Sequence, residues 1–295
     1  MTIYHKIFDK ITTDFKEYEM EDILNLPQYY KWPEMLLENA DLEFHIKTQS
    51  SIYNEYEYDK WGDLYKQVID GKATSIEEVR SIFFGEDVLP AKWQNFYYKV
   101  NGAQYSQIQS NLISLIIKKY QPENIIELGA GFGSMMFGVI KTNYSKEIGY
   151  YCGELTSTGR KLLKNISVFN GIELSVFECD FHKNLSSIDL PENSIIFTSL
   201  AICEVPGLGD DIIDKIIALK PKVVINLEAV YPTHTNTIMD LFVKKYIKYN
   251  NYNTTFQESL KQYSKDKRIK IHSSSESIIG RNPLRPVSLY VWSPT

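Results

Sequence analysis

The apolar run 124–128 leads directly into a turn that is rich in glycine. The turn reads Gly129, Ala130, Gly131, Phe132 and Gly133. Glycine is needed where a strand turns tightly into a helix and a ligand must approach the backbone with no Cβ in the way. Dinucleotide-binding folds use the spacing GxGxxG, which would put the third glycine at Ser134. The GxGxG spacing found here favours an amino-acid tail and a ribose over a pyrophosphate.

Two acidic positions follow the next two apolar runs. Glu154 comes just after the run 148–152, where a carboxylate can accept hydrogen bonds from both ribose hydroxyls. Asp180 and Phe181 come just after the run 173–177, where an acid can take the adenine amino group while an aromatic ring lies against the base. Ligands of open α/β sheets bind at the carboxyl ends of the strands. Together with the glycine turn, these positions indicate a single ligand that contains adenosine.

The elements that would position these residues begin near residue 103, where short apolar runs alternate with helical segments. The expected strands are 124–128, 148–152, 173–177, 194–200, 222–227 and 288–292. Short, nearly continuous apolar strands that alternate with helices imply a parallel sheet covered on both faces. The fold class that we expect is therefore a doubly wound α/β domain.

Residues 1–100 have a different composition, which is rich in aromatic and acidic residues and poor in β-branched runs. Ser75 and Glu78 form a capping-box pattern, which is typical of a helix start. We interpret residues 1–100 as a mainly helical extension or lid, and residues 101–295 as the ligand-binding domain.

From about residue 103 onward the chain resembles the class I S-adenosylmethionine-dependent methyltransferases. The matching positions are Glu127, Gly129, Gly131 and Gly133 in the family's first motif, Glu154 as its ribose acid, and Asp180 with Phe181 as its adenine-recognition pair. The resemblance implies a seven-stranded, Rossmann-like sheet with an antiparallel final hairpin. It also implies S-adenosylmethionine as cofactor, S-adenosylhomocysteine as product, and a place beneath the methionine end of the cofactor for the stretch that contains Ser199 and Leu200. It covers about two thirds of the chain.

Candidates for the methyl-accepting side follow the fourth and fifth expected strands. Methyl transfer requires alignment of donor and acceptor, and removal of a proton when the acceptor is an amine or hydroxyl. Glu204 can orient or deprotonate an acceptor, or only cap the helix that starts near Asp210. Glu228 is the main candidate on the substrate side, and Tyr231 and His234 follow it in one short loop, forming a pocket for the acceptor. His234 can equally be a residue at a helix N-terminus.

Other functions are disfavoured by particular features. The third glycine and the Asp180–Phe181 pair count against an NAD-dependent oxidoreductase. The intact turn and both acids count against a non-catalytic, methyltransferase-like interaction protein. The Asn/Asp-Pro-Pro-Tyr signature of base-modifying enzymes is absent and the net charge is −5, so a nucleic acid is an unlikely partner. We expect a small-molecule or peptide substrate, and no metal, because the sequence lacks a convincing set of metal ligands.

Composition sets the remaining limits. Hydrophobic residues make up 43% and charged residues 23%, which is typical of a globular protein. No apolar run approaches the length of a membrane span, and the start lacks a signal-peptide pattern, so we expect a cytoplasmic protein with reduced cysteines. Basic residues are concentrated in 241–295, with 10 Lys/Arg against 3 Asp/Glu, which we interpret as a solvated face. Nothing in the sequence indicates an oligomeric state.

Overall fold

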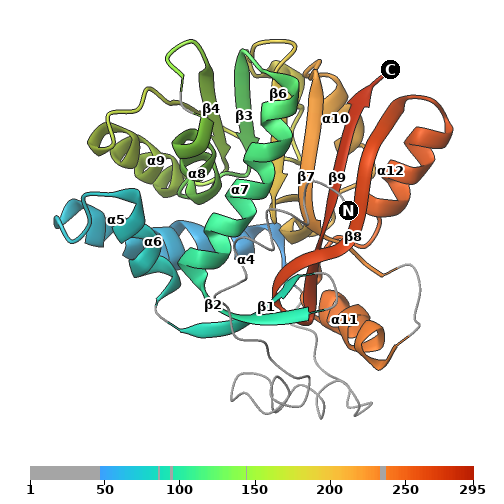
Figure 1. Cartoon of the computed structure of the whole chain (residues 1–295), viewed down its shortest axis with the longest axis horizontal. Coiled ribbons are helices and arrows are strands. Elements are labelled where there is room, and N and C mark those ends of the chain that lie inside the picture. Colours follow the sequence, from blue (N-terminus) through green and yellow to red (C-terminus); the bar gives the residue numbers. More distant parts are fainter. Residues whose placement is uncertain (1–46, 86, 94–95, 144, 233–236) are drawn as a thin grey trace.

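The computed structural model describes residues 47–295 except 86, 94–95, 144 and 233–236. The described residues form a nine-stranded sheet in the order β2-β1-β8-β9-β7-β6-β3-β4-β5 (Figure 1). The strands are β1 (Val88–Trp93), β2 (Phe96–Asn101), β3 (Asn124–Leu128), β4 (Gly149–Glu154), β5 (Ser175–Glu178), β6 (Ile195–Ser199), β7 (Val223–Ala229), β8 (Ile269–Asn282) and β9 (Arg285–Pro294).

Helices cover both faces of this sheet. They are α4 (Gln49–Asn54), the π-helix η1 (Glu55–Lys60), α5 (Trp61–Ile69), α6 (Ile76–Phe84), α7 (Gly102–Tyr120), α8 (Ser134–Asn143), α9 (Ser157–Phe169), α10 (Ile212–Ile217), α11 (Ile238–Tyr249) and α12 (Phe256–Lys265), with short 3₁₀ turns η2 (Leu185–Ser187) and η3 (Ile202–Glu204). Successive residues of β3 point to opposite faces: Ile125 packs into the core with α5–α9, and Ile126 into the core with α10 and α12. This confirms the doubly wound arrangement.

The five strands β5, β4, β3, β6 and β7 pair in parallel. Strand β9 is antiparallel to β7, and β8 is antiparallel to β9, so β8 runs in the same direction as the five parallel strands. Six of these seven strands overlap the strands expected from the sequence, and β8 is the one that was not expected. The expected strand count was nevertheless wrong, because β1 and β2 add a further hairpin at the edge of β8. The segment 96–101 contains aromatic and β-branched residues that favour a strand, with Tyr97 and Val100 buried. The mainly helical interpretation therefore fails for residues 88–101.

Between residues 49 and 84 the described chain is largely helical, as expected. The capping box at the start of α6 is present: the Ser75 hydroxyl accepts from the Glu78 amide at 3.2 Å, and the Glu78 carboxylate accepts from the Ser75 amide at 3.2 Å. Helices α5 and η1 contact α9, and α6 contacts α7 and α8. The helical segment is thus packed against the helices that flank the glycine turn.

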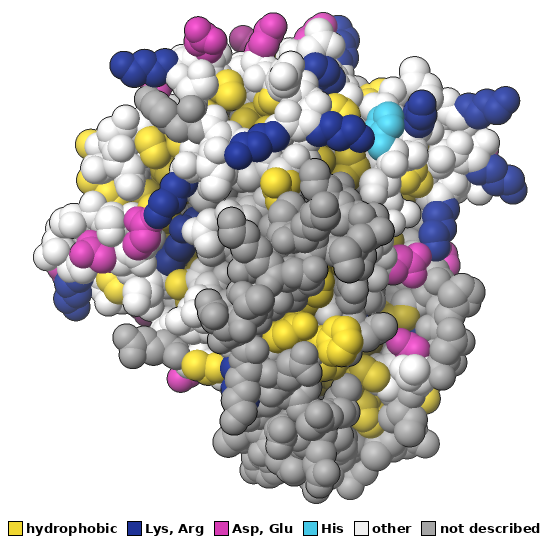
Figure 2. Space-filling view, in the orientation of Figure 1, with side chains coloured by type: hydrophobic (Ala, Val, Ile, Leu, Met, Phe, Trp, Pro, Cys, Tyr) yellow, Lys and Arg dark blue, Asp and Glu magenta, His cyan; other side chains and the backbone are white. Residues whose placement is uncertain are grey.

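The basic residues near the carboxyl end of the chain lie largely in solvent. Figure 2 shows Lys and Arg side chains standing out over α12, the helix at the right of Figure 1. Two of them are paired with acids, Lys261 with Glu276 at 3.2 Å and Arg268 with Asp214 at 2.5 Å. This agrees with the interpretation of a solvated face. None of the described helices combines the length and the apolar character that crossing a bilayer would require.

Candidate functional site

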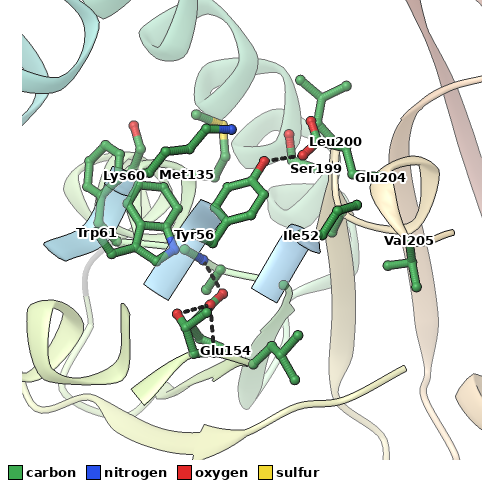
Figure 3. Close-up of a pocket in the computed structure, with 18 of the residues that line it drawn as sticks. Ile52, Tyr56, Lys60, Trp61, Met135, Glu154, Ser199, Leu200, Glu204 and Val205 are labelled. Carbon is green, nitrogen blue, oxygen red and sulfur yellow. Dashed lines mark hydrogen bonds between the residues drawn. The ribbon is translucent and has the colours of Figure 1, made fainter. Parts of the chain in front are cut away.

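A cavity of about 610 Å³ lies at the carboxyl ends of β3, β4, β5 and β6 (Figure 3). Its floor is the edge of the sheet, and its walls come from η1, α6, α7 and the turn between β8 and β9. Of the positions expected to bind the cofactor, all but one line it: Glu127, Gly129, Ala130, Gly131, Glu154, Asp180, Phe181, Ser199 and Leu200. The exception is Gly133. The fold therefore gathers residues from four separate strand ends into one cavity.

The glycine turn has a backbone that other residues rarely adopt. The φ angles of Gly129 and Gly131 are +76° and +56°. A Cβ on Gly129 would stand 2.4 Å from the Ala201 Cβ, and one on Gly131 would stand 2.9 Å from the Trp61 ring. Gly133, at φ +84°, faces Leu163 instead, so it serves packing rather than the cavity wall. The expected reason for glycine, lack of space for a side chain, is met at all three positions.

Glu127 connects β3 to the helix that follows the turn. Its carboxylate accepts from the Met136 amide of α8 at 3.0 Å, and its side chain is buried. Burial raises the pKa of Glu127 well above its ordinary value, and the nearby charge of Glu154 adds to the rise, whereas Met136 and Arg80 oppose it. Glu127 thus holds the first turn of α8 against β3, and it also lines the cavity.

Glu154 lies at the end of β4, directly beside the glycine turn (Figure 3). Its carboxylate accepts from the Gly131 amide at 2.9 Å, from the Thr156 amide at 3.0 Å and from the Thr156 hydroxyl at 2.6 Å. These three bonds involve both carboxylate oxygens and fix the orientation of Glu154 at the edge of the cavity. Asp180 and Phe181 lie beyond it, and Asp180 accepts from the His182 amide at 2.9 Å.

On the other side of the cavity Glu204 is held between two side chains from distant parts of the chain. It accepts hydrogen bonds from the Tyr56 hydroxyl and from Arg285, and its own side chain is 19% exposed. Burial would raise the pKa of Glu204, but Arg285, Lys60 and the Tyr56 hydroxyl outweigh it, so the pKa is lowered. Burial and the charge of Glu204 raise the pKa of Tyr56 well above its usual range. Glu204 is therefore an ionised carboxylate on the cavity wall.

Two other candidates for the acceptor side, Glu228 and Tyr231, do not line the cavity. Glu228 is fully buried behind the loop after β6, where it accepts from the Ala201 amide at 3.2 Å and the Cys203 amide at 3.0 Å. It thereby holds the loop that carries Glu204. Tyr231 lies beside α11, with the Lys244 and Lys248 amino groups 5.4 Å and 5.6 Å from its ring centre. His234 lies outside the described residues.

No protein-family model and no curated protein matches the sequence. Solved structures do match the fold. Magnesium protoporphyrin IX methyltransferase (ChlM) from Synechocystis PCC 6803, crystallised with S-adenosylhomocysteine, is 10% identical over 83% of this chain and 99% of that chain, with a TM-score of 0.51. The chain has the class I methyltransferase fold. The [4+2]-cyclase SpnF is also similar, at 12% identity over 84% of this chain and 98% of that chain, with a TM-score of 0.53.

Within the class I methyltransferase fold, several cavity residues escaped the sequence analysis. They are Tyr56, Trp61, Gln109 and Arg285. Trp61 lies over Gly131, and the Trp61 indole N–H, the Gln109 amide nitrogen and the Arg285 Nε are buried without a hydrogen-bond partner among the described residues. No motif marks these positions. Arg285 follows the Asn-Pro pair at 282–283, which favours a turn but does not indicate a role for the side chain after it.

Aromatic rings form the cavity wall opposite the sheet edge. The Phe132 and Trp61 rings have centroids 5.6 Å apart, Phe83 lies 5.0 Å from Phe132, and Phe84 lies 5.0 Å from Phe83. Arg281 places its guanidinium carbon 5.5 Å from the Phe84 ring centre. The acceptor side of the cavity thus combines an apolar wall of rings with a polar wall of Glu204 and two arginines.

Proposed function

We propose that this protein is an S-adenosylmethionine-dependent methyltransferase that acts on an amine or hydroxyl of a small molecule or peptide. The observation that carries the proposal is the convergence on one cavity of the glycine turn, Glu154 and Asp180–Phe181, in the order in which an amino-acid tail, a ribose and an adenine would meet them. Fold alone does not decide function, so the argument depends on these side chains.

The residues of the cavity fit this cofactor. Gly129 and Gly131 line the cavity at positive φ angles, so the turn presents its backbone to the cavity without a side chain. We assign Glu154 to the ribose hydroxyls, Asp180 to the adenine amino group and Phe181 to the face of the base. Ala130, Ser199 and Leu200 would border the methionine end.

When bound, S-adenosylmethionine supplies a methyl group on a sulfonium sulfur, which an acceptor lone pair displaces to leave S-adenosylhomocysteine. The protein's task is then mainly alignment. Glu204 is ionised and lies on the proposed acceptor side, so we assign it to orient the acceptor. Glu228 is assigned to position the Glu204 loop rather than to contact the acceptor.

We further propose that the helical part of residues 1–100 is a lid over the domain formed by residues 101–295. Two contacts support a lid on the π-helix η1: Tyr56 bonds to Glu204, and Glu57 accepts from the Thr158 amide at 3.0 Å and hydroxyl at 2.8 Å. These contacts reach opposite sides of the cavity. π-helical turns are rare and occur often at functional sites, and lids of this kind exclude water from the reacting groups.

Calorimetric titration with S-adenosylhomocysteine tests the cofactor assignment. The wild type is expected to bind with micromolar affinity, and Asp180→Ala to weaken binding at least about tenfold, since a hydrogen bond to a charged group contributes roughly 1.5–3 kcal/mol. Asp189→Ala is the matched control, because Asp189 is an exposed acid on the same side of the sheet outside the cavity. NAD should not bind. Absence of S-adenosylhomocysteine binding in the wild type would overturn the proposal.

A further inference from the structure

The acceptor side of the cavity contains hydrogen-bond donors that the protein leaves without acceptors. Arg285 illustrates this best. One terminal nitrogen donates to Glu204 and contacts the Cys203 sulfur at 3.5 Å, whereas the Nε is buried with no partner among the described residues. A buried donor that lacks a partner costs free energy. The Nε itself is closed off from the cavity, so a ligand there would meet the exposed part of the Arg285 guanidinium, which lines the cavity.

Arg285 is also fixed in orientation. Its guanidinium carbon lies 4.7 Å from the centre of the Tyr252 ring, and its side chain is only 17% exposed. Glu204 raises the pKa of Arg285 well above its usual value despite the opposing effect of burial, so the group stays cationic. A planar, fixed guanidinium with free donors is the side chain best suited to bind a carboxylate.

The turn between β8 and β9 brings a second guanidinium to the same wall. Arg281 and Arg285 both line the cavity, on either side of Asn282, whose carbonyl oxygen accepts from the Leu284 amide at 2.9 Å and whose amide donates to the Tyr246 hydroxyl at 3.2 Å. Asn282 is thus occupied in holding the turn. Among the acidic residues described in the cavity lining, Glu204 is the one that bonds to Arg285.

Aromatic rings continue the lining next to Arg281, whose guanidinium carbon lies 5.5 Å from the Phe84 ring centre. Phe83, Phe84 and Phe132 all line the cavity, and they form a continuous apolar surface together with Trp61. Such a surface favours a flat, apolar body, since ring-to-ring contacts stabilise by about 0.5–1.5 kcal/mol beyond simple burial. A ligand that satisfies both walls has a planar ring and an anionic group.

We propose that the methyl acceptor is an aromatic acid whose carboxylate is bound by Arg285, with its ring against the phenylalanine wall. This inference rests on the proposed methyltransferase function. Because Glu204 and Arg285 are in direct contact, the acceptor's hydroxyl or amine and its carboxylate lie close together on the ring. Arg281 adds positive charge at the mouth of this subsite.

The test uses the full-length protein saturated with S-adenosylhomocysteine and three probes that differ in charge: 2-hydroxybenzoate, 2-hydroxybenzyl alcohol and 2-hydroxybenzylamine. Ligand-detected NMR titration measures their dissociation constants. The acid is expected to bind at least about tenfold more tightly than the alcohol, as a charged hydrogen bond implies, and the amine more weakly than either. Equal or tighter binding of the alcohol or the amine, or binding of none of the three, would overturn the inference.

Two variants complete the test. Arg285→Lys keeps the charge but loses the Nε donor and the planar fork, so it should remove most of the preference for the acid while S-adenosylhomocysteine still binds. Arg268→Lys, at an exposed arginine on another face, should leave the preference unchanged. The same S-adenosylhomocysteine titration separates the two failures: loss of cofactor binding in the wild type refutes the methyltransferase proposal, and normal cofactor binding without acid preference refutes only this inference.

Discussion

The two sides of the cavity are built in different ways. The side with the glycine turn has a local centre: the Glu127 carboxylate, the turn and the Met136 amide that donates to Glu127 lie within ten residues of one another. The acceptor side is assembled from distant segments, because Glu204 bonds to Tyr56, 148 residues before it, and to Arg285, 81 residues after it. A local site leaves a motif in the sequence, whereas an assembled one exists only in the fold.

The largest expected effect comes from the local side. Gly129→Ala places a Cβ 2.4 Å from the Ala201 Cβ at a positive φ, and strain of about 3 kcal/mol would weaken S-adenosylhomocysteine binding about 100-fold. Gly171→Ala is the matched control, because Gly171 also has a positive φ but has nothing within 4 Å of an added Cβ. It should cost about 1 kcal/mol of folding stability and leave binding intact. Calorimetry measures S-adenosylhomocysteine binding by both variants, and denaturant unfolding measures their stability. If both variants lost binding equally, backbone strain and not crowding of the turn would be responsible.

A smaller effect is expected at the assembled side. Tyr56→Phe removes the hydrogen bond between η1 and Glu204, which should lower the free energy of opening of the lid by about 2 kcal/mol. Amide hydrogen exchange over residues 55–69 should then be faster in the variant. Tyr58→Phe serves as control, because Tyr58 lies in the same π-helix with 65% of its surface exposed. Unchanged exchange in Tyr56→Phe would contradict the lid.

The smallest expected effect is a pH dependence of opposite sign on the two sides. The native pKa of Glu127 is raised, so the native state keeps a proton that the unfolded state releases, and stability falls as pH rises above the ordinary glutamate range towards that raised pKa. The native pKa of Glu204 is lowered, so its contribution is present above the ordinary range and is lost as pH falls through that lowered value.

Denaturant unfolding across pH 3.5 to 8 measures both slopes, each at most about 1.4 kcal/mol per pH unit for one proton. Glu127→Gln should flatten the loss of stability on the alkaline side, and Glu204→Gln the loss on the acid side. If both substitutions changed the same limb of the profile, the electrostatic contrast between the two sides would be wrong.

Much of the fold could be predicted from sequence because it depends on short-range patterns. The apolar runs of β3, β4, β6 and β7 alternate with helices, and that alternation implied the parallel sheet. The hairpin β1–β2 could not be predicted in the same way, because it is stabilised by pairing with β8, nearly 190 residues away, at Lys92–Gly280 and Trp93–Ile279. The segment 88–101 forms strands because it pairs with β8, and the amino-acid composition of the segment alone does not determine this.

The candidate site shows the same contrast between short-range patterns and long-range contacts. The expected cofactor positions line the cavity apart from Gly133, and they remain assignments to be tested. On the acceptor side, Glu204 lines the cavity, but Glu228 does not, although both follow a strand end. Sequence could not separate them, because the difference is that Glu228 turns back to accept the Ala201 and Cys203 amides. Tyr56 and Arg285 carried no local signal at all.

The place of β9 in the sheet has a consequence for the order of assembly. Strand β9 lies between β7 and β8, and it also separates the parallel strands from the β1–β2 hairpin. On a ribosome, where synthesis proceeds at about 5–20 residues per second, the strands β3 to β7 can pair while the chain emerges, but β1 and β2 have no partner in the main sheet until β8 and β9 follow. The half of the cavity that carries the glycine turn can thus form early, and the turn next to Arg285 is completed last, so the two arginines line the cavity only after the whole sheet has formed.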